Sequence, residues 1–122
     1  MNDEIQRDDE PRAGRTGFEA LDVALEMAEA VAPAIARIDA RDKSLADQTR
    51  RAVQSVVLNI AESWKRQGRD RAHGFRVASG SGEEARTALR LAKAWGYAPA
   101  SMLETPLALL DRVMAMLWRL AH

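Results

Sequence analysis

The stretch QTRRAVQSVVLNIAESWKRQG, residues 48 to 68, decides the fold class of this chain. At about 100° per residue of an α-helix, its apolar side chains fall within an arc of about 120°, and its polar side chains gather on another side. With Leu45 just before the stretch, the apolar arc consists of Leu45, Val53, Val56, Val57, Ile60 and Trp64, and the polar side of Gln48, Arg51, Ser55, Asn59, Glu62 and Arg66. The pattern predicts one long amphipathic helix from about residue 45 to residue 67, with Gly68 as its C-terminal cap.

Three further segments repeat this helical pattern. A first helix is expected from about residue 16 to residue 38, where Thr16 and Glu19 have capping-box spacing and Pro33 should kink the helix or limit its second half. A third is expected from about residue 70 to residue 95, and the last begins at Pro99 or at Pro106. The sequence therefore predicts an all-α protein: an antiparallel, up-down-up-down four-helix bundle over residues 16–122, after a disordered polar tail over residues 1–15.

Three glycines lie inside the third expected helix, at Gly74, Gly80 and Gly82, and Gly96 should close it. Each interior glycine costs roughly 1 kcal/mol against alanine. One interpretation is a helix broken by a loop at residues 80–82. The other is a continuous helix that packs closely against a neighbour through small residues. We favour the second, because the helical phase continues across the glycines.

The last expected helix has an apolar arc of about 200°, whereas one bundle-facing stripe needs roughly half that width. The arc consists of Leu107, Leu109, Leu110, Val113, Met114, Met116, Leu117, Trp118 and Leu120. Another subunit is the simplest cover for the surplus, so the last helix predicts a homo-oligomer.

The composition excludes several classes of protein. At 122 residues the chain is long enough for one domain with one core. It has no cysteine and two histidines, so a disulfide framework, a thiolate metal site and imidazole chemistry are not expected. No apolar run approaches the roughly 18 residues of a membrane span, and the polar N-terminus is not a signal peptide. We expect a cytoplasmic protein without cofactor, metal or membrane contact.

A zero net charge hides an asymmetry along the chain. Residues 50 to 93 carry ten Lys and Arg against four Asp and Glu, a net of +6, and the remainder carries eight against fourteen, a net of −6. The candidate nucleic-acid-binding residues are Arg50, Lys65, Arg66, Arg69, Arg71, Arg76, Arg86, Arg90 and Lys93. They either form solvated faces with ordinary i,i+4 pairs, or bind phosphate backbones through counterion release.

Polar residues also occur where apolar ones are expected. Ser81 and Glu84 fall in the middle of the third helix's apolar arc. A carboxylate there must be paired or hydrogen-bonded, so we expect a structural link to Arg51, Ser55 or Asn59 on the second helix. The alternative is a Glu62–Glu84 carboxylate pair for metal or acid–base chemistry, which ranks last because di-iron bundles use Glu-x-x-His motifs that are missing here.

Two motifs stand in the second and third expected helices. The first is Gln48-x-Arg50-Arg51, Ser55 and Asn59-Ile60-Ala61-Glu62, and the second is Gly80-Ser81, Glu84, Leu89, Ala92-Lys93 and Gly96-Tyr97. With Phe18 near the start of the first helix, they resemble the signature of the bacterial four-helix-bundle proteins encoded in intervening sequences of large-subunit ribosomal RNA genes. The resemblance covers about residues 17 to 120 and departs from the family pattern at Val57, Ser63 and Arg86.

The resemblance implies a four-helix bundle that assembles as a homopentamer and has no established enzyme activity. It implies that Asn59, Glu62, Ser81 and Glu84 are motif positions that shape the structure or an interface. The resemblance also extends to a related branch, the accessory proteins of diversity-generating retroelements. These look like basic pentameric barrels of similar build, which bind a reverse transcriptase and nucleic acid.

Three functions compete on these grounds. The first is a non-enzymatic oligomer that binds RNA or DNA backbones, as an accessory to a reverse transcriptase or a ribosomal RNA element. The second is a protein-interaction or scaffolding module that uses the surplus apolar surface of the last helix. The third is an enzyme or metal protein built on Glu62 and Glu84.

Overall fold

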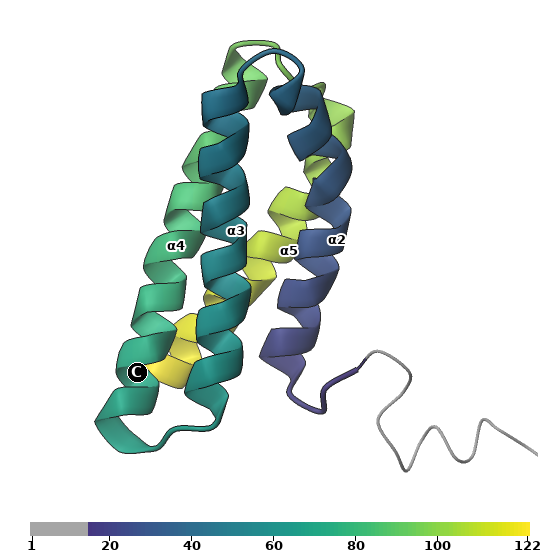
Figure 1. The fold of residues 1–122 in the computed structure, drawn as a ribbon. Coiled ribbons are helices and arrows are strands. Elements are labelled where there is room, and N and C mark those ends of the chain that lie inside the picture. Colours follow the sequence, from purple (N-terminus) through teal and green to yellow (C-terminus); the bar gives the residue numbers. More distant parts are fainter. Residues whose placement is uncertain (1–14) are drawn as a thin grey trace, which may run out of the picture.

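The computed structural model describes residues 15–122, which form four helices and no strand. The helices are α2 (Glu19–Asp39), α3 (Lys43–Trp64), α4 (Gly68–Ala94) and α5 (Ala100–Ala121). In Figure 1 the colours run up α2, down α3, up α4 and down α5. The all-α, four-helix prediction is confirmed for this part of the chain. The predicted tail, residues 1–15, lies outside the described residues except for Arg15.

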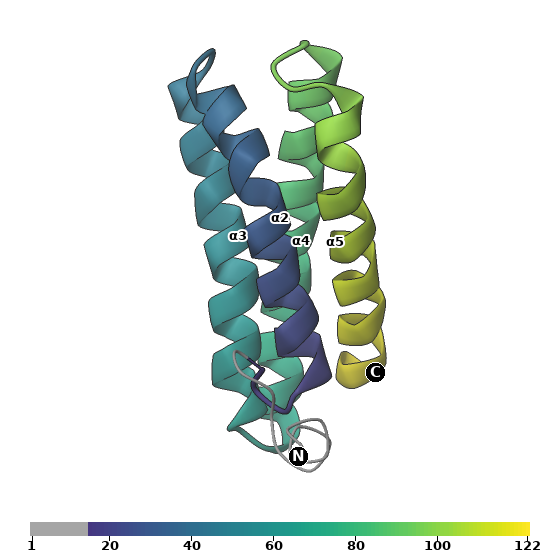
Figure 2. The ribbon, with the colours of Figure 1, turned by 90° about the vertical axis from the view of Figure 1, so that its right-hand side faces the viewer.

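The four helices enclose one apolar core. Each packs against its neighbours along the chain, and α2 also packs against α5, so the ring of helices is closed. The largest fully buried side chains come from all four helices: Phe75, Met27, Ile38, Ile60, Leu89, Leu103, Leu110, Leu117, Val31, Val56, Val113 and Thr49. The start of α2, the α3–α4 turn and the C-terminus lie at the same end of the molecule (Figures 1 and 2).

The start of α2 differs from the predicted capping box. The helix begins at Glu19, and the Thr16 hydroxyl accepts a hydrogen bond from the Phe18 backbone N–H at 3.0 Å. The Thr16 backbone N–H donates to Asp22 at 2.8 Å, and Arg15 forms an ion pair with the same carboxylate at 3.3 Å. Asp22 is only 6% exposed, so these two partners offset the cost of its burial. Thr16 therefore stabilises the turn before the helix.

The α3–α4 connection corrects the predicted role of Gly68. Helix α3 ends at Trp64, and Gly68 is the first residue of α4, with φ +60°. A left-handed φ favours glycine. Gly68 therefore allows the chain to turn into α4, and it does not cap the C-terminus of α3. The Phe18 ring stacks on Trp64 at 4.9 Å between centroids, which fixes the start of α2 against this end of α3.

The other two predicted ends agree with the structure. Gly96, with φ +73°, follows α4, and the Tyr97 N–H returns to the Ala92 carbonyl at 2.8 Å, as in a glycine-terminated helix. Helix α5 begins at Ala100 with Pro99 as its N-cap, which decides between the two predicted starts. Pro106 lies inside α5 and is buried.

Helix α4 runs without interruption through its interior glycines. A Cβ atom added at Gly74 would collide with the Ser63 side chain of α3, and one added at Gly82 would collide with the Met114 sulfur of α5. Gly80 has open space instead. The predicted continuous, closely packed helix is therefore confirmed at Gly74 and Gly82, and the packing reason is wrong for Gly80.

Candidate functional site

A polar link joins α3 to α4 halfway along the molecule. The Ser55 and Ser81 hydroxyls lie 2.6 Å apart in a hydrogen bond, although their residues are separated by 26 positions in the chain. The Asn59 side-chain amide donates to the Ser55 hydroxyl at 3.1 Å and to the Ser55 carbonyl at 2.8 Å. The predicted inter-helix link is thus confirmed between Ser55 and Ser81, whereas Asn59 bonds only to Ser55 on its own helix; all three residues are partly buried.

The acidic motif residues do not take part in this link. Glu84 is exposed and has no hydrogen bond or ion pair with another described residue, so the prediction that it must be paired is wrong. The buried stripe of α4 runs through Phe75, Ala78 and Leu89, which leaves Glu84 on the flank of the helix.

Two other predicted motif residues are also exposed. Arg51 faces solvent on α3. Glu62 pairs with Arg66 one helical turn away, at 3.5 Å, and both side chains are about half exposed or more. Across residues 15–122, no group of three or more His, Asp or Glu side chains comes together as a metal site.

Five of the predicted cationic residues surround the α3–α4 turn, and we call this region the basic end. It consists of Lys65, Arg66, Arg69, Arg71 and Arg76. Four are exposed, and Arg71 is half-buried with its guanidinium over the Phe75 ring at 5.6 Å from the centroid. Arg76 donates to the Ala121 carbonyl at 3.4 Å, so it also holds the end of α5. Within the described chain the basic end forms one carboxylate ion pair, from Arg66 to Glu62.

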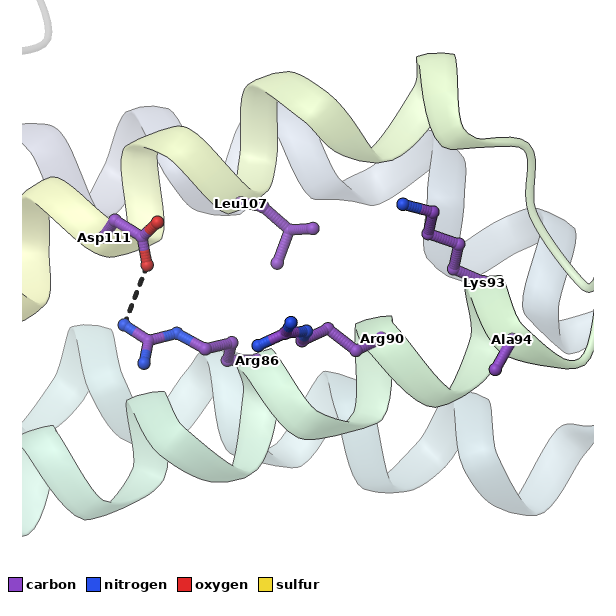
Figure 3. A pocket seen from close by; sticks show the side chains of 6 residues that line it. All are labelled: Arg86, Arg90, Lys93, Ala94, Leu107 and Asp111. Carbon is purple, nitrogen blue, oxygen red and sulfur yellow. Dashed lines mark ion pairs between the residues drawn. The ribbon is translucent and has the colours of Figure 1, made fainter.

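Three more predicted cations line a groove between α4 and α5, which we call the α4/α5 groove. Its volume is about 660 Å³, and its walls are Arg86, Arg90, Lys93, Ala94, Leu107 and Asp111. Figure 3 shows Arg90 lying along α4 and Lys93 reaching toward α5. The sequence identified the three cations as candidate nucleic-acid-binding residues but gave no indication that α5 would complete a groove with Leu107 and Asp111.

Arg86 fixes one end of the α4/α5 groove. Its Nη2 atom lies 2.8 Å from Asp111 Oδ1 of α5 (Figure 3), and its Nη1 atom lies 3.3 Å from the Glu83 carboxylate. The side chain is only 26% exposed, and its Nε is buried without a hydrogen-bond partner among the described residues. Arg86 is therefore a partly buried bridge between two helices instead of the solvent-facing cation that the sequence suggested.

Arg50 stands apart from both cationic regions. It pairs with Asp47 at 2.8 Å on its own helix and lines a different groove, between α2 and α3. The predicted set of nine cations is therefore divided: five at the basic end, three in the α4/α5 groove, and Arg50 alone.

Together these features define a small helical protein whose described surface concentrates cations at one end and in one groove. The chain belongs to the 23S rRNA-intervening sequence protein family, whose family model matches residues 18–119. The resemblance inferred from the two motifs is thus confirmed.

A solved structure has a fold similar to that of this chain. The chain is similar to the crystal structure of a protein of unknown function from the S23 ribosomal protein family of Bacteroides thetaiotaomicron. The TM-score is 0.76 at 20% sequence identity, with 84% of this chain and 97% of that chain covered. Among curated proteins no relative matches. Within residues 15–122, no helix is long and apolar enough to cross a membrane.

Proposed function

We propose that this protein is a non-enzymatic, oligomeric nucleic-acid-binding protein of the cytoplasm. The observation that carries the proposal is the basic end, where five cations around one turn share a single carboxylate ion pair within the described chain. Cations without carboxylate partners remain available to replace the counterions of a phosphate backbone, and the release of those counterions favours binding. Such contacts are made to phosphates and not to bases, so we expect only a weak preference for nucleotide sequence.

Charge reversal at the basic end tests the proposal. We expect the variant Arg66→Glu/Arg69→Glu to bind single-stranded RNA and duplex DNA at least tenfold more weakly than the unchanged protein at low salt. A matched control reverses two exposed cations elsewhere, Arg37 at the end of α2 and Lys43 at the start of α3. Binding that is absent at low salt, or that falls equally in both variants, would refute the role of the basic end.

Self-association is the second part of the proposal, and the family resemblance favours a homopentamer. Large apolar side chains remain exposed on α5, where Trp118 is 61% and Leu120 is 39% exposed. Others lie on α3 and after α4, where Leu58 is 65% and Trp95 is 57% exposed. Large apolar side chains left in water on so small a domain favour a surface that another subunit covers. In an oligomer the basic ends of several subunits would add, which strengthens binding to a long polyanion.

Light scattering of the purified protein separates self-association from the second candidate function. A stable oligomer means that these apolar side chains are covered by other copies of the chain. A monomer leaves them for a different protein, and the protein would then be an interaction or scaffolding module. A reverse transcriptase is the protein partner that the resemblance favours.

A further inference from the structure

We propose that the α4/α5 groove is a binding site for a phosphate monoester of nucleotide size. The source of that group is either the terminal phosphate of a nucleic-acid strand or a free nucleotide. The strand form rests on the proposed function, whereas the free-nucleotide form does not. The charges that line the groove and the size of the groove both favour such a ligand.

The groove carries more positive charge than its own carboxylate can neutralise. Three cations and Asp111 line it, and Glu83 at its edge also pairs with Arg86, so the three cations and two carboxylates together carry a net charge of +1. Asp111 and Glu83 occupy the Nη atoms of Arg86, but neither Arg90 nor Lys93 has a carboxylate partner among the described residues. A phosphate monoester carries about −1.5 to −2 charges near pH 7, whereas each backbone diester carries one. The two cations without a carboxylate partner, Arg90 and Lys93, therefore match the charge of a terminal phosphate better than that of a single backbone phosphate.

The positions of the two available cations favour a ligand over ordinary helix capping. Lys93 is close to the C-terminus of α4, where a cation would stabilise the helix dipole. Figure 3 shows instead that the Lys93 side chain points from α4 toward α5, and that Arg90 lies along α4 with its guanidinium beside Arg86. Both side chains thus border the same open space beside Leu107. The Arg90 guanidinium and the Lys93 ammonium are drawn apart (Figure 3), but both side chains are long and exposed, so they can turn to hold different oxygens of one phosphate.

The size and the walls of the groove set the rest of the ligand. About 660 Å³ is more than a bare phosphate fills and lies within the range of small-molecule sites. Leu107 and Ala94 supply apolar wall, which lowers the local dielectric and strengthens the attraction between the cations and an anion. The Arg86–Asp111 ion pair at 2.8 Å closes the other end of the groove. The ligand is thus a phosphate joined to an organic group that lies along Leu107.

Titration calorimetry of the full chain tests this assignment with four probes: adenosine 5′-monophosphate, adenosine, and a hexanucleotide with a 5′-phosphate or a 5′-hydroxyl. The groove variant is Arg90→Ala/Lys93→Ala. The matched control, Lys65→Ala/Arg69→Ala, removes the same charge from the basic end. All four residues are exposed, so both variants should fold, which circular dichroism can check.

We expect one monophosphate to bind per chain and adenosine not to bind. The groove variant should lose about tenfold or more in affinity for the monophosphate, and the control less than twofold. The variant Asp111→Asn should tighten binding about threefold or more, because it removes the competing carboxylate and frees the Nη2 atom of Arg86, whereas Glu62→Gln should have no effect.

Each other outcome is informative. Equal losses in the groove and control variants, or equal binding of adenosine and its monophosphate, would overturn the site. If the monophosphate does not bind but the 5′-hydroxyl hexanucleotide binds in a salt-dependent way, the groove site is wrong and the proposed function stands. Binding of the monophosphate without either hexanucleotide keeps the site for free nucleotides and refutes the proposed function. A preference for the 5′-phosphate hexanucleotide assigns the site to strand ends.

Discussion

Alanine substitution at three glycines of α4 should change stability in opposite directions, although the three changes are chemically identical. Gly74, Gly80 and Gly82 all lie in the interior of one helix, so each alanine gains roughly 1 kcal/mol of helix propensity. What differs is the space that the new methyl group enters. The three variants therefore separate the packing of α4 from its propensity.

Gly80→Ala is the reference, because nothing lies within 4 Å of the added Cβ. It should stabilise the protein by about 0.5–1 kcal/mol. At Gly74 the new Cβ would lie 2.8 Å from the Ser63 Cβ and still closer to its hydroxyl oxygen. Overpacking of this kind costs typically about 1–3 kcal/mol, so Gly74→Ala should be a net loss of up to about 2 kcal/mol. Gly82→Ala should fall between the two, because the flexible Met114 side chain can move away.

Urea or guanidinium unfolding at one fixed protein concentration measures these differences, and the fixed concentration keeps any contribution from assembly constant. A Ser63→Gly/Gly74→Ala double variant is the control, because it removes the colliding side chain and should recover most of the loss. Equal effects at Gly74 and Gly80 would refute the close approach of α3 and α4. A loss of stability in Gly80→Ala would show that Gly80 packs closely against another subunit.

Three further predictions concern the polar link, a helix cap and the exposed apolar surface. Ser81→Ala should lower the free energy of unfolding by about 1 kcal/mol, and a double-mutant cycle with Ser55→Ala should give a coupling energy of about 0.5 kcal/mol or more. Additive losses would mean that the 2.6 Å hydrogen bond does not contribute to stability. Asp42→Ala should lower the free energy of unfolding by about 1 kcal/mol, because the Asp42 carboxylate accepts a hydrogen bond from the Leu45 N–H at 3.0 Å and so caps α3. An unchanged unfolding midpoint would contradict this cap. Trp118→Ser should lower the mass measured by light scattering without lowering helix content, whereas an unchanged oligomer would exclude Trp118 from the subunit contact.

The sequence predicted the helices well because their main signals are local. The apolar period of residues 45–64 and the glycine after α4 depend on neighbours a few positions away, and both agree with the structure. The predicted ends failed at Thr16 and Gly68. The Thr16 backbone and side chain bond within a turn that depends on the buried Asp22, and Gly68 adopts its left-handed φ to start α4.

The candidate site was harder to predict because it depends on how neighbouring helices are rotated. The broad apolar arc assigned to α4 included Glu84, but the true buried stripe lies to one side of it. For the same reason the sequence could not pair Arg86 with Asp111, which is 25 residues away on α5. The link from Ser55 to Ser81 was easier to predict, because Ser81 falls within the apolar arc of its helix, where a hydroxyl needs a hydrogen-bond partner on a neighbouring helix.

The salt dependence of nucleic-acid binding tests the proposed function most directly. For single-stranded RNA, the logarithm of the binding constant falls with the logarithm of the salt concentration by about 0.7 per phosphate contact. Contacts from the five cations of the basic end predict a slope of about −3.5 per subunit, and Arg66→Glu/Arg69→Glu should reduce its magnitude by about 1.4 or more. A slope near zero, or the same slope in the unchanged protein and in this variant, would contradict nucleic-acid binding through the basic end.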